Sequence, residues 1–192
     1  MNILLEDNER PPNQVKRRFD PNRRERIIEA TLETIANNGV SETTLRRVAT
    51  AANVPLGSLT YHFTGRDDLL LASFQEFTKQ MLSHFDSYMS KAKTVEDAKE
   101  IVIAHICGDG WVSKRNLLLS YELCAFSSRM DHSSSILRSW LEGVRIILMR
   151  FFDKRTADAL DALIEGYSIH RSFDLDSSTR EDIEFIVNKI IE

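Results

Sequence analysis

Residues 43–63, TTLRRVATAANVPLGSLTYHF, constrain the fold more than any other stretch of this 192-residue chain. From Leu45 onward, apolar side chains recur at steps of three and four, which predicts a short amphipathic helix. Pro55 ends that helix, because proline disfavours helical backbone in the residue before it, yet it suits the first turn of a new one. Leu59 and Phe63 lie four apart and predict a second short helix with one inward face. Two short helices joined by a tight turn form a helix-turn-helix, whose second helix can enter a DNA major groove.

The rest of the chain also shows helical periodicity. An earlier helix begins near Asp20-Pro21 and ends at Gly39, which can adopt a left-handed cap, and a capping box at Thr64–Asp67 opens a long helix. No obvious strand-like alternation appears, so the sequence predicts an all-α fold. The further helices are expected over 94–107, 113–130, 135–152, 156–171 and 178–191.

Three segments, Arg23–Gly39, Thr43–Phe63 and Gly65–Leu70, resemble in their order the N-terminal part of the TetR/AcrR family of transcriptional regulators. The resemblance implies an N-terminal three-helix helix-turn-helix DNA-binding domain, followed by a C-terminal helical ligand-binding and dimerisation domain. The expected divisions are a flexible basic arm at 1–19, the DNA-binding domain at 20–66 with its motif at about 44–63, and the regulatory domain at 67–192. For 1–19, a solvated tail is the alternative to an arm that contacts DNA.

The charge distribution agrees with DNA binding although the chain is acidic overall, with a net charge of −4. Residues 13–66 hold nine Lys or Arg against five Asp or Glu. Exposed charges more than about 10 Å apart are largely screened at ~0.1 M salt, so local charge decides phosphate contact. The acidic remainder therefore does not exclude DNA as a partner.

The resemblance also implies which side chains contact DNA. This chain departs from the usual pattern at Pro55, where a serine is common, at Leu56, where polar residues are common, and at Thr60, where an aromatic residue is expected. Leu56, Ser58 and Thr60 are expected to read bases, while the other candidates contact the backbone. The full set is Thr43, Thr44, Arg46, Arg47, Pro55, Leu56, Gly57, Ser58, Thr60, Tyr61, His62 and Arg66.

Residues 135–152 carry two neighbouring apolar stripes, which cover a wider arc than a one-sided surface helix needs. One stripe can face the protomer's own core while the other faces a second subunit, and in TetR-like proteins the last two long helices pair in this way. The alternative is that both stripes are intramolecular core. The expected homodimer interface is Ile136, Trp140, Ile147, Phe151, Leu160, Leu163, Ile164 and Tyr167.

A small-molecule pocket is expected among the helices that follow residue 67, since such sites combine an apolar lining with a few polar groups. For each candidate, a place in the ordinary core or surface is the alternative, and such residues more often have that role. The candidates are Phe77, Met81, His105, Trp111, Tyr121, Glu122, Cys124, Trp140 and Arg145.

Other functional classes have little support. No phosphate-binding glycine loop, nucleophile elbow or HExxH motif occurs, so an enzyme is not expected. The pairs His105/Asp109 and His170/Asp174 have a spacing that suits two metal ligands each, but helical salt bridges give the same spacing, and neither metal nor cofactor is expected. The two cysteines, the lack of an apolar run long enough for a membrane span and the lack of a signal pattern favour the cytoplasm.

The sequence therefore predicts a homodimeric DNA-binding regulator, a repressor that a small-molecule effector releases from a palindrome-like operator in double-stranded DNA. A helical protein-interaction module on the same dimeric fold, with no small-molecule inducer, is the alternative.

Overall fold

The structure is a computed structural model that describes residues 20–108, 113–129, 134–173 and 178–192. All regular secondary structure in these residues is helical, as the sequence predicts, and no described helix is both long and apolar enough to cross a bilayer. The helices are α1 (Arg23–Glu42), α2 (Leu45–Ala51), α3 (Leu56–His62), α4 (Arg66–Met89), α5 (Val95–Ile106), α6 (Lys114–Ser127), α7 (Ser134–Leu148), α8 (Lys154–Ser172) and α9 (Arg180–Ile191).

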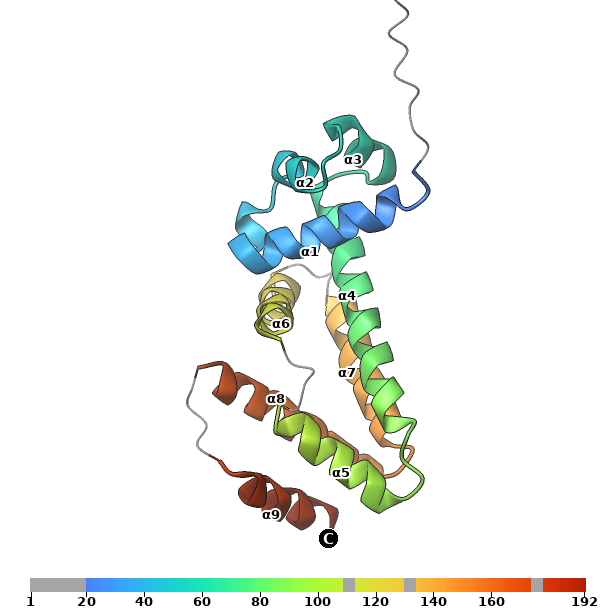
Figure 1. Cartoon of the computed structure of the whole chain (residues 1–192), viewed down its shortest axis with the longest axis vertical. Coiled ribbons are helices and arrows are strands. Elements are labelled where there is room, and N and C mark those ends of the chain that lie inside the picture. Colours follow the sequence, from blue (N-terminus) through green and yellow to red (C-terminus); the bar gives the residue numbers. More distant parts are fainter. Residues whose placement is uncertain (1–19, 109–112, 130–133, 174–177) are drawn as a thin grey trace, which may run out of the picture.

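Helices α1–α3 form a head at one end of an elongated molecule, and α4 runs from this head toward the opposite end, where α5, α8 and α9 lie (Figure 1). Helix α7 lies alongside α4, and α6 packs under α1. Helix α4 therefore connects the two ends of the molecule without an intervening loop.

The helix ends agree with the local sequence, with small differences. Gly39 has φ 77° and ψ 164°, so it interrupts the helical backbone inside α1 where a left-handed cap is predicted. Thr44 caps α2 by accepting a hydrogen bond from the Arg47 backbone N–H. The predicted box at the start of α4 is wrong in its partner, because Thr64 bonds to Asp68 and not to Asp67. Helix α1 begins at Arg23, three residues later than Asp20.

Two apolar clusters hold the helices together. The first joins the head to the rest of the molecule, because Leu32, Val48 and Leu59 from α1–α3 pack in one cluster with Phe74 of α4 and Leu123 of α6. The second lies at the opposite end, between α4, α5, α7, α8 and α9. The core is thus continuous across residue 66, so the predicted boundary there does not coincide with a gap in packing.

The expected subunit stripe faces inward at several positions. Ile136, Ile147, Leu160 and Ile164 are all buried within the protomer, so they are not available to a second subunit. The dimer prediction is wrong for these four residues. The other four, Trp140, Phe151, Leu163 and Tyr167, are half-buried and remain predicted interface residues. Helix α7 packs between α4 and α8, so the second stripe on its wide apolar face meets another helix of the same chain.

Candidate nucleic-acid interface and effector pocket

The outward face of α3 is the candidate reading surface. Leu59 and Phe63 are buried, as predicted, and Tyr61 on the other side of α3 is 84% exposed. Leu56, in the first turn of α3, is 41% exposed. The surrounding predicted contacts are also accessible: Thr44, Arg46, Arg47, Pro55, Gly57 and Thr60 are exposed, while Ser58 and His62 are half-buried.

Two predicted DNA contacts are instead part of the scaffold of the head. Thr43 is only 1% exposed, and its hydroxyl donates a hydrogen bond to the Gly39 carbonyl at 2.8 Å. Arg66 donates from Nε to the Thr43 carbonyl at 2.8 Å and from Nη2 to the Val40 carbonyl. These bonds fasten the start of α4 to residues 39–44, which comprise the kinked end of α1 and the link to α2 and are here named the α1–α2 connection. The prediction that the Thr43 hydroxyl contacts the DNA backbone is therefore wrong, and much of the hydrogen-bonding capacity of Arg66 is used internally.

A second contact that supports the head comes from α6. Glu122 of α6 accepts a hydrogen bond at Oε2 from the Val40 backbone N–H, at 2.9 Å. It was expected in the ligand pocket, but the structure places its carboxylate against the α1–α2 connection instead. Val40 is thereby held on both sides, because its N–H meets α6 and its carbonyl meets Arg66 of α4.

Arg115, near the start of α6, makes a second link between α6 and the head. Its guanidinium forms ion pairs with Glu29 at 2.6 Å and Glu33 at 2.5 Å, two residues one turn apart on α1. Exposed ion pairs contribute little stability individually, so these two add to the apolar packing of α6 under α1 only modestly.

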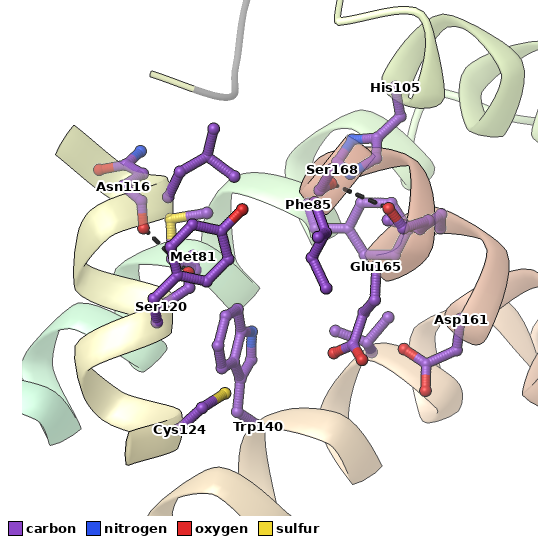
Figure 2. Close-up of a pocket in the computed structure, with 15 residues that line it drawn as sticks. Met81, Phe85, His105, Asn116, Ser120, Cys124, Trp140, Asp161, Glu165 and Ser168 are labelled. Atoms are coloured by element: carbon purple, nitrogen blue, oxygen red, sulfur yellow. Dashed lines mark hydrogen bonds between the residues drawn. The ribbon is translucent and has the colours of Figure 1, made fainter. Parts of the chain in front are cut away.

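The pocket lies between α4, α5, α6, α7 and α8 and has a cavity volume of about 150 Å³. Five of the nine ligand candidates line it: Met81, His105, Tyr121, Cys124 and Trp140. The sequence interpretation missed the other lining residues, which are Phe85, Asn116, Leu117, Ser120, Val144, Asp161, Ile164, Glu165, Ser168 and Ile169. Figure 2 shows aromatic and carboxylate side chains facing the same space.

The remaining candidates lie elsewhere. Phe77 is fully buried behind the pocket and meets the Trp140 ring edge-on at 5.9 Å between centroids. Arg145 does not line the cavity but pairs with the lining residue Asp161, Nε to Oδ2, at 2.8 Å. Trp111 lies outside the described residues, as do the arm at 1–19 and the second members of the metal pairs, Asp109 and Asp174.

The pocket has no free positive charge among its described lining residues. It contains no Lys or Arg, and burial lowers the pKa of its one histidine, His105, to about 3, with the nearby His84 adding to the effect. Burial raises the pKa of both lining carboxyls, Asp161 and Glu165, although hydrogen bonding to Arg145 opposes the shift at Asp161. The spacing of these two carboxyls along one apolar helix was the signal that sequence reasoning overlooked.

Comparison with known proteins shows which proteins share this sequence and architecture. Residues 27–73 match the family described as bacterial regulatory proteins, tetR family. The chain is 39% identical over 155 residues to the HTH-type transcriptional regulator BetI of Paraburkholderia phymatum, covering 75% of this chain and 78% of that protein. It is 30% identical over 161 residues to the regulator BetI 1 of Chromohalobacter salexigens, covering 77% and 78%.

The chain belongs to the TetR family. Among solved structures, a transcriptional regulator from Streptomyces coelicolor A3(2) superposes with a TM-score of 0.83 at 37% identity, covering 89% of this chain and 99% of that one. The multidrug binding protein EbrR complexed with ethidium superposes with a TM-score of 0.74 at 28% identity, covering 90% and 100%. This TetR-family chain is a DNA-binding transcriptional regulator with an N-terminal helix-turn-helix and a helical C-terminal part.

Proposed function

We propose that this TetR-family regulator is a repressor that binds an operator as a homodimer and leaves it when a small molecule occupies the pocket between α4 and α8. The observation that carries the proposal is that α6 contacts both the pocket and the head. Ser120, Tyr121 and Cys124 line the pocket, while Glu122 of the same helix bonds to the head through Val40. A ligand that alters the position of α6 must therefore also alter the α1–α2 connection.

Release of DNA requires a ligand with different affinities for the two arrangements of the head, because a ligand that binds both equally shifts nothing. The pocket supports such a role, since it is a cavity that side chains leave open. EbrR, a structural relative over most of its length, is a multidrug binding protein. The alternative, an interaction module without an inducer, fits a pocket filled by side chains and is not favoured.

The first test is selection of bound DNA from a random pool by the purified chain. We expect enrichment of a palindrome-like sequence with half-sites about one helical turn apart or a multiple of it, because a two-fold dimer presents two heads. Retention that depends on salt but enriches no sequence would contradict the proposal of a specific operator.

The second test concerns the link through α6. We expect Glu122→Ala to retain ligand binding but to reduce the effect of the ligand on operator affinity, because the Val40 N–H loses its partner on α6. Glu142→Ala, at an exposed position of α7, is the control. Fluorescence anisotropy of labelled operator with and without ligand gives the readout. Unchanged release by Glu122→Ala would show that coupling does not pass through this bond.

A further inference from the structure

Three carboxylates lie on one face of α8, at Asp158, Asp161 and Glu165, which are three and four residues apart. Two of them have cationic partners. Asp158 receives Lys154 at 2.6 Å, and Asp161 receives Arg145 at 2.8 Å. For Glu165, no Lys, Arg or His nitrogen among the described residues lies within 4 Å of its carboxylate. Glu165 therefore has no cation paired with it directly, although the charge of Arg145 acts on it from a greater distance.

Glu165 lies at the rim of the cavity, where solvent and apolar walls meet. Glu165 is exposed overall, and its carboxylate projects into the space between Trp140 and Asp161 (Figure 2). Burial nevertheless raises the pKa of its carboxyl, and the charge of Asp161 adds to the shift while that of Arg145 opposes it. A bound positive charge at this position relieves both effects.

The other walls suit the body of such a ligand. Phe85, Tyr121 and Trp140 line the cavity, and aromatic faces attract cations through the ring quadrupole. The same lining disfavours anionic ligands. Its described residues include two carboxylates, no Lys or Arg and a histidine that stays neutral at pH 7. A cavity of about 150 Å³ holds a molecule the size of a substituted benzene.

We propose that the effector of this regulator is a small lipophilic organic cation, such as an aryl or alkyl ammonium, whose charge lies against the Glu165 carboxylate while its apolar body fills the cavity beside Trp140. The inference rests on the proposed function, because it takes this cavity to be the effector site. It adds the chemical class of the ligand and the residue that selects it.

The test compares three probes of similar size on the full-length dimer: phenyltrimethylammonium, its neutral isostere tert-butylbenzene, and benzoate. Trp140 is one of only two tryptophans in the chain and lines the cavity, so quenching of its emission in a Trp111→Phe background reports binding directly. We expect the cation to bind about tenfold or more tightly than the neutral isostere and benzoate to bind least. Equal affinities for cation and isostere, stronger binding of benzoate, or no binding of the cation at millimolar concentration would overturn the proposal.

The variant Glu165→Gln tests the residue itself. We expect it to lose about tenfold in affinity for the cation and to leave the affinity for tert-butylbenzene within about threefold, because only the charge is removed. Glu142→Gln removes the same charge from an exposed position of α7 and serves as the control. Unchanged affinity of Glu165→Gln for the cation overturns the assignment, and the wild-type comparison of the three probes stands whether or not the variant folds.

Operator release separates this inference from the proposed function. If the cation binds through Glu165 but the operator complex persists, the ligand class is right and the release mechanism is wrong. If the neutral or anionic probe releases the operator while the cation does not, the release mechanism is right and the ligand class is wrong.

Discussion

Tyr61 is the most exposed aromatic residue of the head, and no packing requirement explains its position. Its ring meets His62 edge-on with centroids 4.9 Å apart, which limits its orientation at the end of α3. A hydroxyl at the tip of a rigid, exposed ring suits a phosphate or sugar contact.

We expect Tyr61→Ala to weaken binding to specific and random DNA alike by about tenfold, because a backbone contact carries no sequence information. Ser58→Ala should instead change the preference among operator variants. Tyr88→Ala, at an exposed tyrosine of α4 outside the head, is the control. Gel-shift titrations on selected and scrambled DNA measure both effects, and full operator affinity in Tyr61→Ala would exclude the proposed docking.

His105 is the most perturbed titratable group of the pocket wall. Its pKa of about 3 in the folded state lies below the ordinary value of 6.5, because burial disfavours the charged ring. Between these two values the unfolded chain binds a proton that the folded chain does not. This component of stability is therefore present above pH 6.5 and is lost as the pH falls toward 3.

We expect His105→Gln to reduce the loss of unfolding free energy between pH 7 and pH 5 by up to about 2 kcal/mol. His170→Gln makes the same substitution at an exposed position of α8 and is the control. Urea unfolding at both pH values and at one fixed protein concentration gives the comparison. An unchanged pH slope in His105→Gln would show that the imidazole titrates in the folded protein as it does in the unfolded chain.

The α1–α2 connection is the element of the head that contacts both α4 and α6. Gly39 adopts φ 77° there, and a Cβ at this position would lie 3.0 Å from Oε1 of Glu122. Glycine is required for two reasons, the left-handed backbone and the close approach of the α6 carboxylate.

We expect Gly39→Ala to destabilise the fold by about 1–3 kcal/mol, because the backbone is strained and the Glu122 carboxylate must move. Gly57→Ala is the matched control in α3, where nothing lies within 4 Å of the added methyl group. That variant should gain about 0.5–1 kcal/mol from helix propensity. Thermal unfolding measures both, and equal stabilities of the two variants would contradict the role given to Gly39.

On the scale of the whole molecule, large exposed apolar side chains lie near the end of α8 and on α9. Ile169 and Phe173 at the end of α8 and Phe185 on α9 are each at least 46% exposed. Exposed large apolar side chains on the last two helices mark a candidate subunit contact. We propose that Ile169, Phe173 and Phe185, together with the half-buried Leu163 and Tyr167, form the subunit interface. They replace the four predicted interface residues that are buried within the protomer.

We expect Phe185→Glu to shift the chain toward a monomer and to lower operator affinity by at least about tenfold, because one head then binds without its partner. Glu181→Gln changes an exposed position on the same helix without adding or removing apolar surface. Sedimentation velocity gives the oligomeric state over a range of concentrations. A Phe185→Glu protein that remains dimeric would place the subunit contact elsewhere.

Local sequence was enough to predict the helices, the break at Gly39, the inward direction of Leu59 and Phe63 and the exposed face of α3. Periodicity, proline and capping act over a few residues, so they are readable along the chain. The family resemblance in the head likewise depends on residues that are close in sequence.

The rotation of each long helix about its own axis depends on contacts between distant segments. The wide apolar arc on α7 indicates that two partners cover this helix. It does not indicate whether the second partner is α8 of the same chain or another subunit. For the same reason, the sequence alone does not distinguish Glu122 from Glu165, since each is an acidic residue within a helix. Packing turned one toward the backbone of the head and the other toward an aromatic cavity, and this difference separates the proposed coupling residue from the proposed effector-binding residue.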